Sequence, residues 1–167
     1  MIFDNRLSEL HPKTSAEHET VTRLQLRLAA LDPTGSRTAK NVSAALTNWG
    51  LALANEGDYE KAVRFHEIAL GFAPDCREIR TNTRYTWVRA VEAAVSAGQD
   101  KEAVALVGRA RKQLPKDDDF ATAAKWFVFA AYTARDKGGW AAAVAVLNRG
   151  LTVVPDGERA ELKADKF

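Results

Sequence analysis

This chain has a single cysteine, no long apolar run and no large excess of charge of one sign. Its 167 residues contain one cysteine, Cys76, which excludes an internal disulfide framework and is typical of a reducing compartment. Lysine and arginine number 24 against 22 acidic residues, so no overall field attracts the chain to nucleic acid or to a membrane surface. The longest apolar stretches, such as 127–132 and 140–147, are too short to cross a bilayer.

A targeting signal is not recognisable either. Asp4, Arg6 and Glu9 interrupt the region where a secretory signal needs a continuous apolar run. The length fits one domain, which is large enough to bury a continuous core if its elements stack in register. We therefore expect a soluble, cytoplasmic protein that does not bind membranes.

The motifs that mark common enzyme sites do not occur. There is no His-Glu-x-x-His, no Gly-x-Ser-x-Gly, no phosphate-binding loop and no cysteine pair. We expect His66 to be a packed ring with one satisfied nitrogen, and Cys76 to be a small buried thiol. The aspartates at 117–119 indicate a solvated helix start, which the macrodipole favours, and not a metal site. We expect no enzymatic activity, no cofactor and no metal.

One spacing is present three times: a glycine, four residues, an Ala-Val pair, ten residues and a proline. It occurs at Gly57/Ala62/Val63/Pro74, Gly98/Ala103/Val104/Pro115 and Gly138/Ala143/Val144/Pro155, with a small residue seven after each alanine at Ala69, Ala110 and Gly150. Together with Pro33, the three prolines follow one another at nearly equal intervals. Such a period, of roughly 40 residues, indicates one helical unit stacked on copies of itself.

Apolar periodicity and punctuation place the helices. Val42, Leu46, Trp49 and Leu53 fall three or four residues apart and predict a helix over about 38–56, which the Gly-Asp pair at 57–58 ends. The same reasoning predicts helices over 15–31, 59–72, 117–137 and 140–153. In the middle repeat it predicts a first helix that ends at about 97 and a second that ends at about 113. A short helix or a frayed end is expected over 156–167. An aspartate at 75 with a glutamate at 78 predicts a capping box for the helix that follows.

Small side chains recur where paired helices are expected to touch. Ala62, Ala103 and Ala143 mark a close contact of the second helix with the first, where a larger side chain would cost roughly 1–3 kcal/mol. Gly50 lies inside a predicted helix, at a cost of about 1 kcal/mol relative to alanine, and therefore indicates close backbone approach.

The segments Asn48-Trp49-Gly50, 57–62 and Ala69-Leu70 with Pro74 resemble a tetratricopeptide repeat. The sequence departs from that family at Val91 and Ala131, which replace the helix glycine, at Gly150, which replaces an alanine, and in its period, which is longer than that of the family. A HEAT-type or Sel1-like array is the alternative that the period admits. The resemblance implies an all-α, right-handed α-solenoid of antiparallel helix pairs in a single domain over 1–167. Its parts would be a degenerate half repeat over 1–33, repeats over 34–74, 75–115 and 116–155, and a tail over 156–167.

In this family the first helices line a concave face that holds an extended peptide or a partner helix. Carried over in register, the inward positions are Ala44, Thr47, Asn48, Leu51, Asn55, Tyr85, Val88, Arg89, Glu92, Ser96, Lys125, Val128, Phe129, Tyr132 and Asp136. Asn48 and Asn55 offer carboxamides that bracket a peptide backbone group, unless they simply bind water. Tyr85, Phe129 and Tyr132 would supply apolar anchors, unless they pack against neighbouring helices.

The resemblance therefore implies a non-catalytic module that binds a protein or peptide partner. Asn48 and Arg89 also match two members of the family's carboxylate clamp, which grips chaperone tails, although Tyr85 stands where a lysine is expected. A self-associating scaffold, a homo-oligomer or a piece of a longer protein are alternatives. RNA binding is the least favoured, through basic faces at Arg77, Arg80 and Arg84 or at Arg109, Arg111 and Lys112.

The four tryptophans are expected to divide between core and surface. Trp49 and Trp87 fall on the apolar stripes of their helices and are expected in the core. Trp140 is expected to pack in a turn between helices, in the place that Tyr59 has in the first repeat. Trp126 lies off the main stripe, and its exposure would make it a candidate contact residue.

Overall fold

The computed structural model describes residues 11–31 and 36–164, and this part of the chain is all-helical. It contains seven α-helices, two short 3₁₀ helices and no β-strand, which confirms the predicted all-α class. No helix within these ranges has the length and apolar character needed to span a membrane. Asp4, Arg6 and Glu9, as well as Pro33 and the last residues of the predicted tail, lie outside the described residues.

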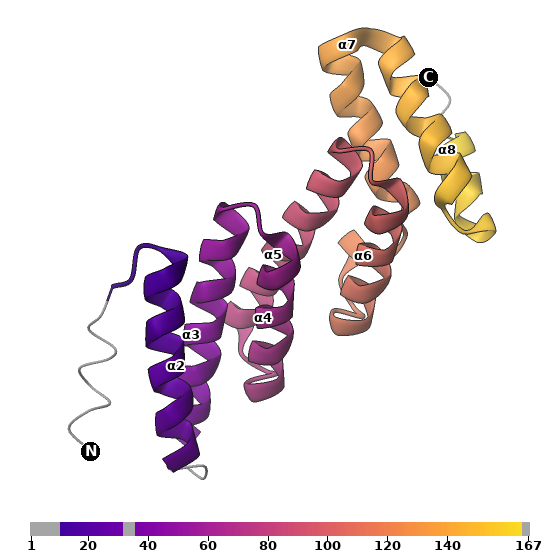
Figure 1. Ribbon diagram of the computed structural model, residues 1–167. Helices are drawn as coiled ribbons and strands as arrows, with labels where there is room; N and C mark the ends of the chain where they lie inside the picture. The colour runs from indigo at the N-terminus through magenta and orange to yellow at the C-terminus, as the bar shows by residue number, and fades with distance from the viewer. Residues whose placement is uncertain (1–10, 32–35, 165–167) are drawn as a thin grey trace. The chain divides into compact units, whose positions relative to one another are not determined.

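The helices begin and end close to where the sequence predicts. They are α2 (Ser15–Leu31), α3 (Ser36–Asn55), α4 (Tyr59–Phe72), α5 (Arg77–Ser96), α6 (Asp100–Gln113), η1 (Asp118–Phe120), α7 (Ala124–Val153), η2 (Asp156–Glu158) and α8 (Arg159–Ala164) (Figure 1). The bounds of α2 and α4 are those expected, and α3 differs by two residues or fewer at each end. Periodicity and punctuation therefore suffice for the amino-terminal helices.

The predicted helix start at 117 is wrong. Asp117 caps only a 3₁₀ turn, because its side chain accepts from the backbone N–H of Asp119, and α7 begins at Ala124. Phe120 is fully buried and stacks on Trp126, and its carbonyl accepts from Nε of Arg111 at 3.0 Å. Burial of this aromatic ring holds 118–120 outside the helix that local acidic residues favour.

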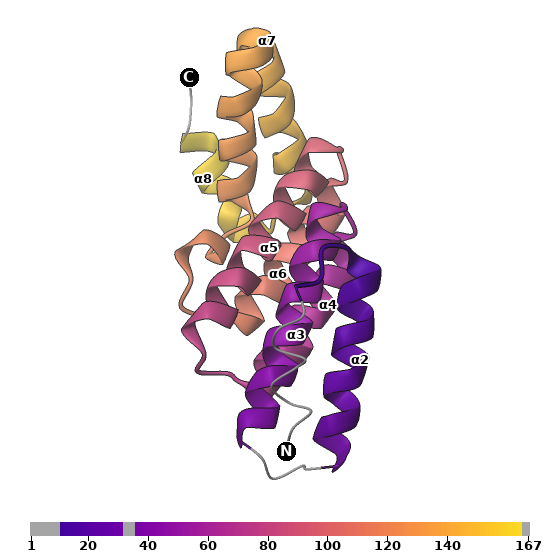
Figure 2. The same ribbon diagram turned by 90° about the vertical axis from the view of Figure 1, so that its left-hand side faces the viewer.

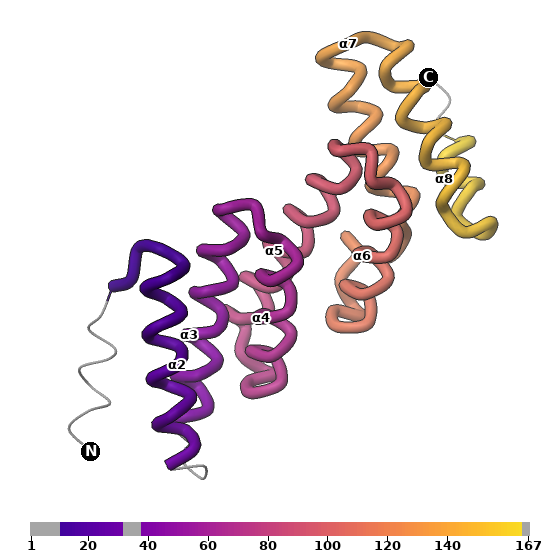
Figure 3. Tube along the Cα trace, in the orientation of Figure 1, coloured from indigo at the N-terminus to yellow at the C-terminus, as the bar shows by residue number. Residues whose placement is uncertain are grey.

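Among the described residues, three turns that join helices are built on a glycine with positive φ. These are Gly57 (φ 88°), Gly98 (φ 74°) and Gly139 (φ 75°), a conformation that costs other residues steric strain. The third differs from the predicted spacing, because the left-handed residue is Gly139 and not Gly138. At this point α7 reverses direction, and its two halves form a hairpin (Figure 3).

The chain divides into two compact units, Met1–Thr86 and Trp87–Phe167, and the boundary falls inside α5. In the amino-terminal unit, α3 packs against both α2 and α4, and the three helices lie side by side (Figures 1 and 2). One cluster joins Val42 and Leu46 of α3 to Ala69 of α4, and a second joins Leu53 to Ala62. Each cluster takes residues from both helices, so burial of these side chains holds α3 against α4.

The carboxyl-terminal unit contains the second half of α5, α6, both halves of α7, and α8, which packs against α7. Trp87 is fully buried, and its Nε1 donates to Oε1 of Gln113 at 2.9 Å. Glu158 caps α7 from a distant part of the chain, because its Oε2 accepts from N of Ala123 at 2.7 Å. Contacts distant in sequence therefore fix the start of α7.

The expected role of Trp140 is wrong, whereas the close approach at Gly50 is confirmed. Trp140 is 55% exposed, and the Arg135 guanidinium lies 5.4 Å from its ring centroid, because the turn at Gly139 leaves the indole outside the hairpin. Ala62, Ala103 and Ala143 are buried. A Cβ at Gly50 would lie 3.1 Å from the backbone oxygen of Ala62, so glycine is required where α3 meets α4.

Candidate functional site

A groove in the amino-terminal unit is the larger of the two hollows considered as sites. Its volume is about 900 Å³. We call it the carboxamide groove; it is lined by Ala39, Lys40, Asn41, Ala44, Thr47 and Asn48 of α3, by Phe72 of α4, by 73–76, and by Glu78, Ile79 and Asn82 of α5. The expected inward positions Ala44, Thr47 and Asn48 therefore lie on one surface.

Polar side chains of the carboxamide groove come from two helices. Asn48 is exposed on α3 and Asn82 is half-buried on α5, and neither carboxamide makes a hydrogen bond to any described residue. Thr47 is different, because its hydroxyl donates to the backbone oxygen of Ser43 at 2.8 Å and is used by the fold. Two carboxamides therefore remain available to a ligand, each with one acceptor oxygen and two N–H donors.

Phe72 and Ile79 are the large apolar side chains among the residues that line the groove. Phe72 is 42% exposed, whereas Ile79 belongs to the buried cluster of α3 and α4. At the start of α5, Sγ of Cys76 donates to Oε2 of Glu78 at 3.2 Å. The backbone N–H of Glu78 and, to a smaller extent, this Cys76 hydrogen bond lower the pKa of the Glu78 carboxyl. Cys76 is half-buried and lines the groove, so the expectation of a small buried thiol is wrong. It precedes Arg77, and its carbonyl accepts from the N–H of Arg80 at the first turn of α5.

Several predicted site residues of this unit lie outside the groove. Leu51 is half-buried on α3, while Asn55 and Tyr85 are exposed, and none of the three lines the groove. Asn82 was missed by the family register. A signal for it exists in the sequence, because Asn41 and Asn82 lie one repeat period apart, as Pro33 and Pro74 do, and both line the groove.

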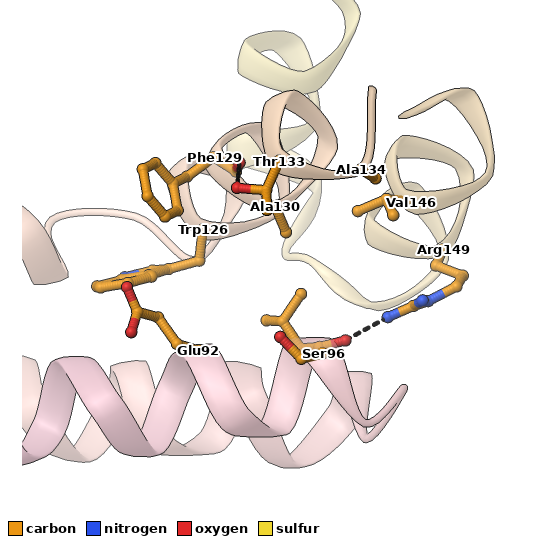
Figure 4. Close-up of a pocket in the computed structure, with 10 residues that line it drawn as sticks. Glu92, Ser96, Trp126, Phe129, Ala130, Thr133, Ala134, Val146 and Arg149 are labelled. Atoms are coloured by element: carbon orange, nitrogen blue, oxygen red, sulfur yellow. Dashed lines mark hydrogen bonds between the residues drawn. The ribbon is translucent and has the colours of Figure 1, made fainter. Parts of the chain in front are cut away.

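A smaller pocket, of about 400 Å³, lies in the carboxyl-terminal unit (Figure 4). We call it the aromatic pocket; it is lined by Glu92, Val95 and Ser96 of α5 and by Trp126, Phe129, Ala130, Thr133, Ala134, Val146 and Arg149 of α7. The predicted site residues Glu92 and Phe129 are brought together here, with Ser96 at the same surface. The first and second halves of α7 both contribute, so the reversal at Gly139 is what closes the pocket.

The two aromatic side chains of the pocket are held differently. Trp126 is only 8% exposed, and its Nε1 donates to the backbone oxygen of Asp119 at 2.9 Å, which fixes the plane of the indole. Phe129 is 56% exposed and has no such anchor. Although Trp126 is almost fully buried, it still lines the pocket.

Arg149 is the positively charged residue among those that line the pocket, and its place there was not predicted from the sequence. Its Nη2 and Nε lie 2.7 and 3.0 Å from Oδ1 and Oδ2 of Asp100, and its Nη2 also donates to the carbonyl of Val95 at 2.7 Å (Figure 4). The hydrogen bonds to Asp100 raise the pKa of Arg149. The ion pair ties the second half of α7 to the end of α5 and the start of α6.

The remaining predicted site residues of this unit lie outside the pocket. Lys125 is exposed, and its Nζ donates to the backbone oxygen of Asp118 at 3.2 Å. Tyr132 is 39% exposed beneath the Arg135 guanidinium, 5.2 Å from the ring centroid, and Arg89 is half-buried. Within the carboxyl-terminal unit, only Glu92 and Phe129 of the predicted site residues line the pocket.

His66 is the packed ring that the sequence predicts. It is fully buried, with Nε2 2.9 Å from Oγ1 of Thr86, while its Nδ1 has no hydrogen-bond partner among the described residues. Burial lowers the pKa of His66 from its ordinary 6.5 to about 4. The ring is neutral at pH 7 and closed to solvent, so its role is structural.

The basic residues considered for RNA binding lie on α5 and α6. Arg77, Arg80 and Arg84 are exposed on α5. On α6, the Arg109 guanidinium lies 5.3 Å from the ring centroid of Trp87, and Arg111 pairs with Glu158 at 3.3 Å. Within the described ranges, no group of three or more histidine, cysteine, aspartate or glutamate side chains is arranged to hold a metal ion.

Comparisons with known proteins assign no relatives to this chain. No model of a known protein family matches the sequence, and no curated protein matches it either. The tetratricopeptide resemblance therefore depends on the residues and spacing that carry it. Function has to be inferred from the chemistry of the carboxamide groove and the aromatic pocket.

Proposed function

We propose that the chain is a non-catalytic interaction module built from tetratricopeptide-like helix pairs, and that its carboxamide groove binds an extended peptide segment of a protein partner. The arrangement of the pairs as a right-handed solenoid is part of this proposal. Support for the pairs comes from helix bounds near the predicted ones, from glycine turns one period apart, and from the contact of Gly50 with α4.

The observation that carries the proposal is that Asn48 of α3 and Asn82 of α5 line the same groove. Neither carboxamide is used by the described part of the fold. An extended peptide presents N–H and C=O groups along its length, and a carboxamide pairs with both kinds of group at once. Two carboxamides that approach from α3 and α5 therefore suit a backbone lying between them.

Apolar side chains of the groove would add to the affinity for a peptide by burying apolar surface. Phe72 exposes an aromatic ring beside Pro74, and Ala44 leaves room on α3 for a side chain of the peptide. Removal of such apolar surface from water contributes roughly 25 cal/mol per Å². Hydrogen bonds to the carboxamides then fix the direction and register of the peptide.

The test selects peptides from a random phage-displayed library on the full chain and measures the affinity of one selected peptide by fluorescence anisotropy. Asn48→Ala and Asn82→Ala should each raise its Kd about fivefold, because one net hydrogen bond is worth about 1 kcal/mol. Asn55→Ala is the matched control, since Asn55 is exposed on α3 outside the groove. Its Kd should equal that of the wild type.

A second arm uses the sole cysteine, which lines the groove. Alkylation of Cys76 with N-ethylmaleimide places a bulky group there and should abolish binding of the selected peptide. The proposal is wrong if no peptide can be selected. It is equally wrong if the peptide binds the alkylated chain and the two asparagine variants as tightly as the wild type.

A further inference from the structure

The aromatic pocket carries one carboxylate that the fold does not neutralise. Glu92 is half-buried on α5, and it makes no hydrogen bond or ion pair with any described residue. Its side chain points toward the indole of Trp126 (Figure 4). A partly desolvated carboxylate without a partner attracts a cation more strongly than one in water does.

Among the described residues, the one cation that lines the pocket is already neutralised. Arg149 is bound through two nitrogens to Asp100, and one of these nitrogens also donates to Val95. Because its charge is compensated by Asp100, the guanidinium is not available to Glu92. The charge left facing the pocket is therefore that of one carboxylate.

The aromatic side chains reinforce this preference. The side-chain donor of Trp126 is used by Asp119, so the indole offers its ring to the pocket and not its N–H. Phe129 exposes more than half of its side chain and lies beside it on α7. The faces of aromatic rings attract cations by about 0.5–2 kcal/mol, and tryptophan does so most strongly.

We propose that the aromatic pocket binds an organic ammonium group, with Glu92 as the counter-ion and the rings of Trp126 and Phe129 as the walls. The volume of about 400 Å³ is large enough to admit such a group, for example a quaternary ammonium or the end of a lysine side chain. This inference concerns the carboxyl-terminal unit alone. It does not depend on the peptide groove of the amino-terminal unit.

The experiment follows the indole N–H signal of Trp126 by ¹H–¹⁵N NMR on the full chain, assigned by its disappearance in Trp126→Phe. Three probes are titrated at matched ionic strength: choline, N-acetyl-lysine amide, and 3,3-dimethylbutan-1-ol, the neutral isostere of choline. We expect saturable shifts with at least one ammonium probe. That probe should bind at least tenfold more tightly than the neutral alcohol, and the tighter of the two ammonium probes identifies the kind of group preferred.

Glu92→Gln removes the charge and keeps the shape of the side chain. It should weaken binding of the ammonium probe about tenfold and leave the weak binding of the alcohol unchanged. Glu102→Gln is the matched control, because Glu102 is an exposed carboxylate on α6 outside the pocket, and it should bind as the wild type does. Dispersion of the amide signals verifies that each variant is folded.

Three outcomes would overturn the proposal. One is that no probe shifts the Trp126 signal, another that choline and its neutral isostere bind equally, and the third that Glu92→Gln binds as the wild type does. Because peptide selection reports on the carboxamide groove and this signal reports on Trp126, failure of one proposal is distinguishable from failure of the other.

Discussion

In the amino-terminal unit a glycine lies on the first helix of the pair and faces a large ring on the second, whereas in the carboxyl-terminal unit the order is reversed. A Cβ at Gly50 of α3 would lie 2.9 Å from Nε2 of His66 on α4. A Cβ at Gly150, in the second half of α7, would lie 2.8 Å from Cγ of Phe127 in the first half. Both glycines make room for a ring of the partner helix.

Residues two repeat periods apart, such as Pro74 and Pro155, occupy equivalent places in the two helix pairs. In this register, the Gly50/His66 pair of the amino-terminal unit corresponds to Ala131/Leu147 of the carboxyl-terminal unit. The Leu46/Ala69 pair corresponds in the same way to Phe127/Gly150. In each comparison a larger side chain on one helix accompanies a smaller one on the other. Because protein interiors are close-packed, the fold constrains the combined volume of the two side chains at a contact. It does not constrain which of the two helices carries the larger side chain.

The largest expected effect concerns the ring that only the amino-terminal unit has at this contact. Burial gives His66 a pKa of about 4 in the folded state against about 6.5 when unfolded. Its contribution to stability is therefore complete above pH 6.5 and is lost as the pH falls toward 4, since only the unfolded chain takes up the proton. The loss amounts to about 3 kcal/mol.

The measurement is urea unfolding at pH 7 and at pH 4. His66→Leu introduces the residue of the equivalent contact and removes the titrating group. Between pH 7 and pH 4, the unfolding free energy of this variant should therefore fall by about 3 kcal/mol less than that of the wild type. Equal losses in the two proteins would show that His66 is accessible to protons in the folded state. His11 and His18 are unchanged in both and cancel in the comparison.

The next effect tests whether volume is shared between helices at the carboxyl-terminal contact. Gly150→Ala should cost about 1–3 kcal/mol because the added methyl group meets Phe127. Phe127→Leu should cost about 1 kcal/mol through the space it leaves. The double variant Phe127→Leu/Gly150→Ala reproduces the Leu46/Ala69 pair. In a double-mutant cycle, its loss of unfolding free energy should be smaller than the sum of the two single losses by about 0.5 kcal/mol or more.

A control for this cycle is available on α6. A Cβ at Gly108 meets no described atom within 4 Å, so Gly108→Ala should stabilise the chain by up to about 1 kcal/mol through helix propensity. Strict additivity of Phe127→Leu and Gly150→Ala would argue against compensation of volume. Thermal or urea unfolding of the four proteins decides between these outcomes.

The smallest effect concerns the caps of the second helices, which also differ between the units. Asp58 caps α4, since its side chain accepts from N of Lys61 at 3.3 Å, whereas the equivalent residue before α6, Gln99, makes no such bond. We expect Asp58→Ala to destabilise by about 1 kcal/mol and Gln99→Asp to stabilise by about 0.5–1 kcal/mol. Urea midpoints that move the other way would show that the cap difference has no energetic weight.

Local patterns were sufficient for much of the fold. The ends of α2 and α4, the close approach at Gly50 and the packed ring of His66 all follow from periodicity, punctuation and spacing along the chain. The start of α7 did not follow. It depends on Glu158, which is distant in sequence and accepts from the N–H of Ala123.

The candidate sites were less predictable than the helices. The register of the repeats predicted an inward position for Asn48, which lines the carboxamide groove, but it missed Asn82, which lines the same groove. It predicted inward positions for Glu92 and Phe129, which both line the aromatic pocket, but it missed Arg149, whose pairing with Asp100 leaves Glu92 as the uncompensated charge. A register predicts which positions of one helix share a face, and it does not predict which side chains of other helices neutralise them.

The amino-acid sequence by itself determined most helix ends, the glycine turns at 57 and 98 and the close approach at Gly50, because these follow from backbone conformation and from spacing within one or two turns. Only the tertiary structure decided which side chains of paired helices meet and which polar groups the fold consumes. It also decided which of those groups remain for a ligand. These outcomes depend on volume and charge summed over segments that are distant in sequence and meet only after folding.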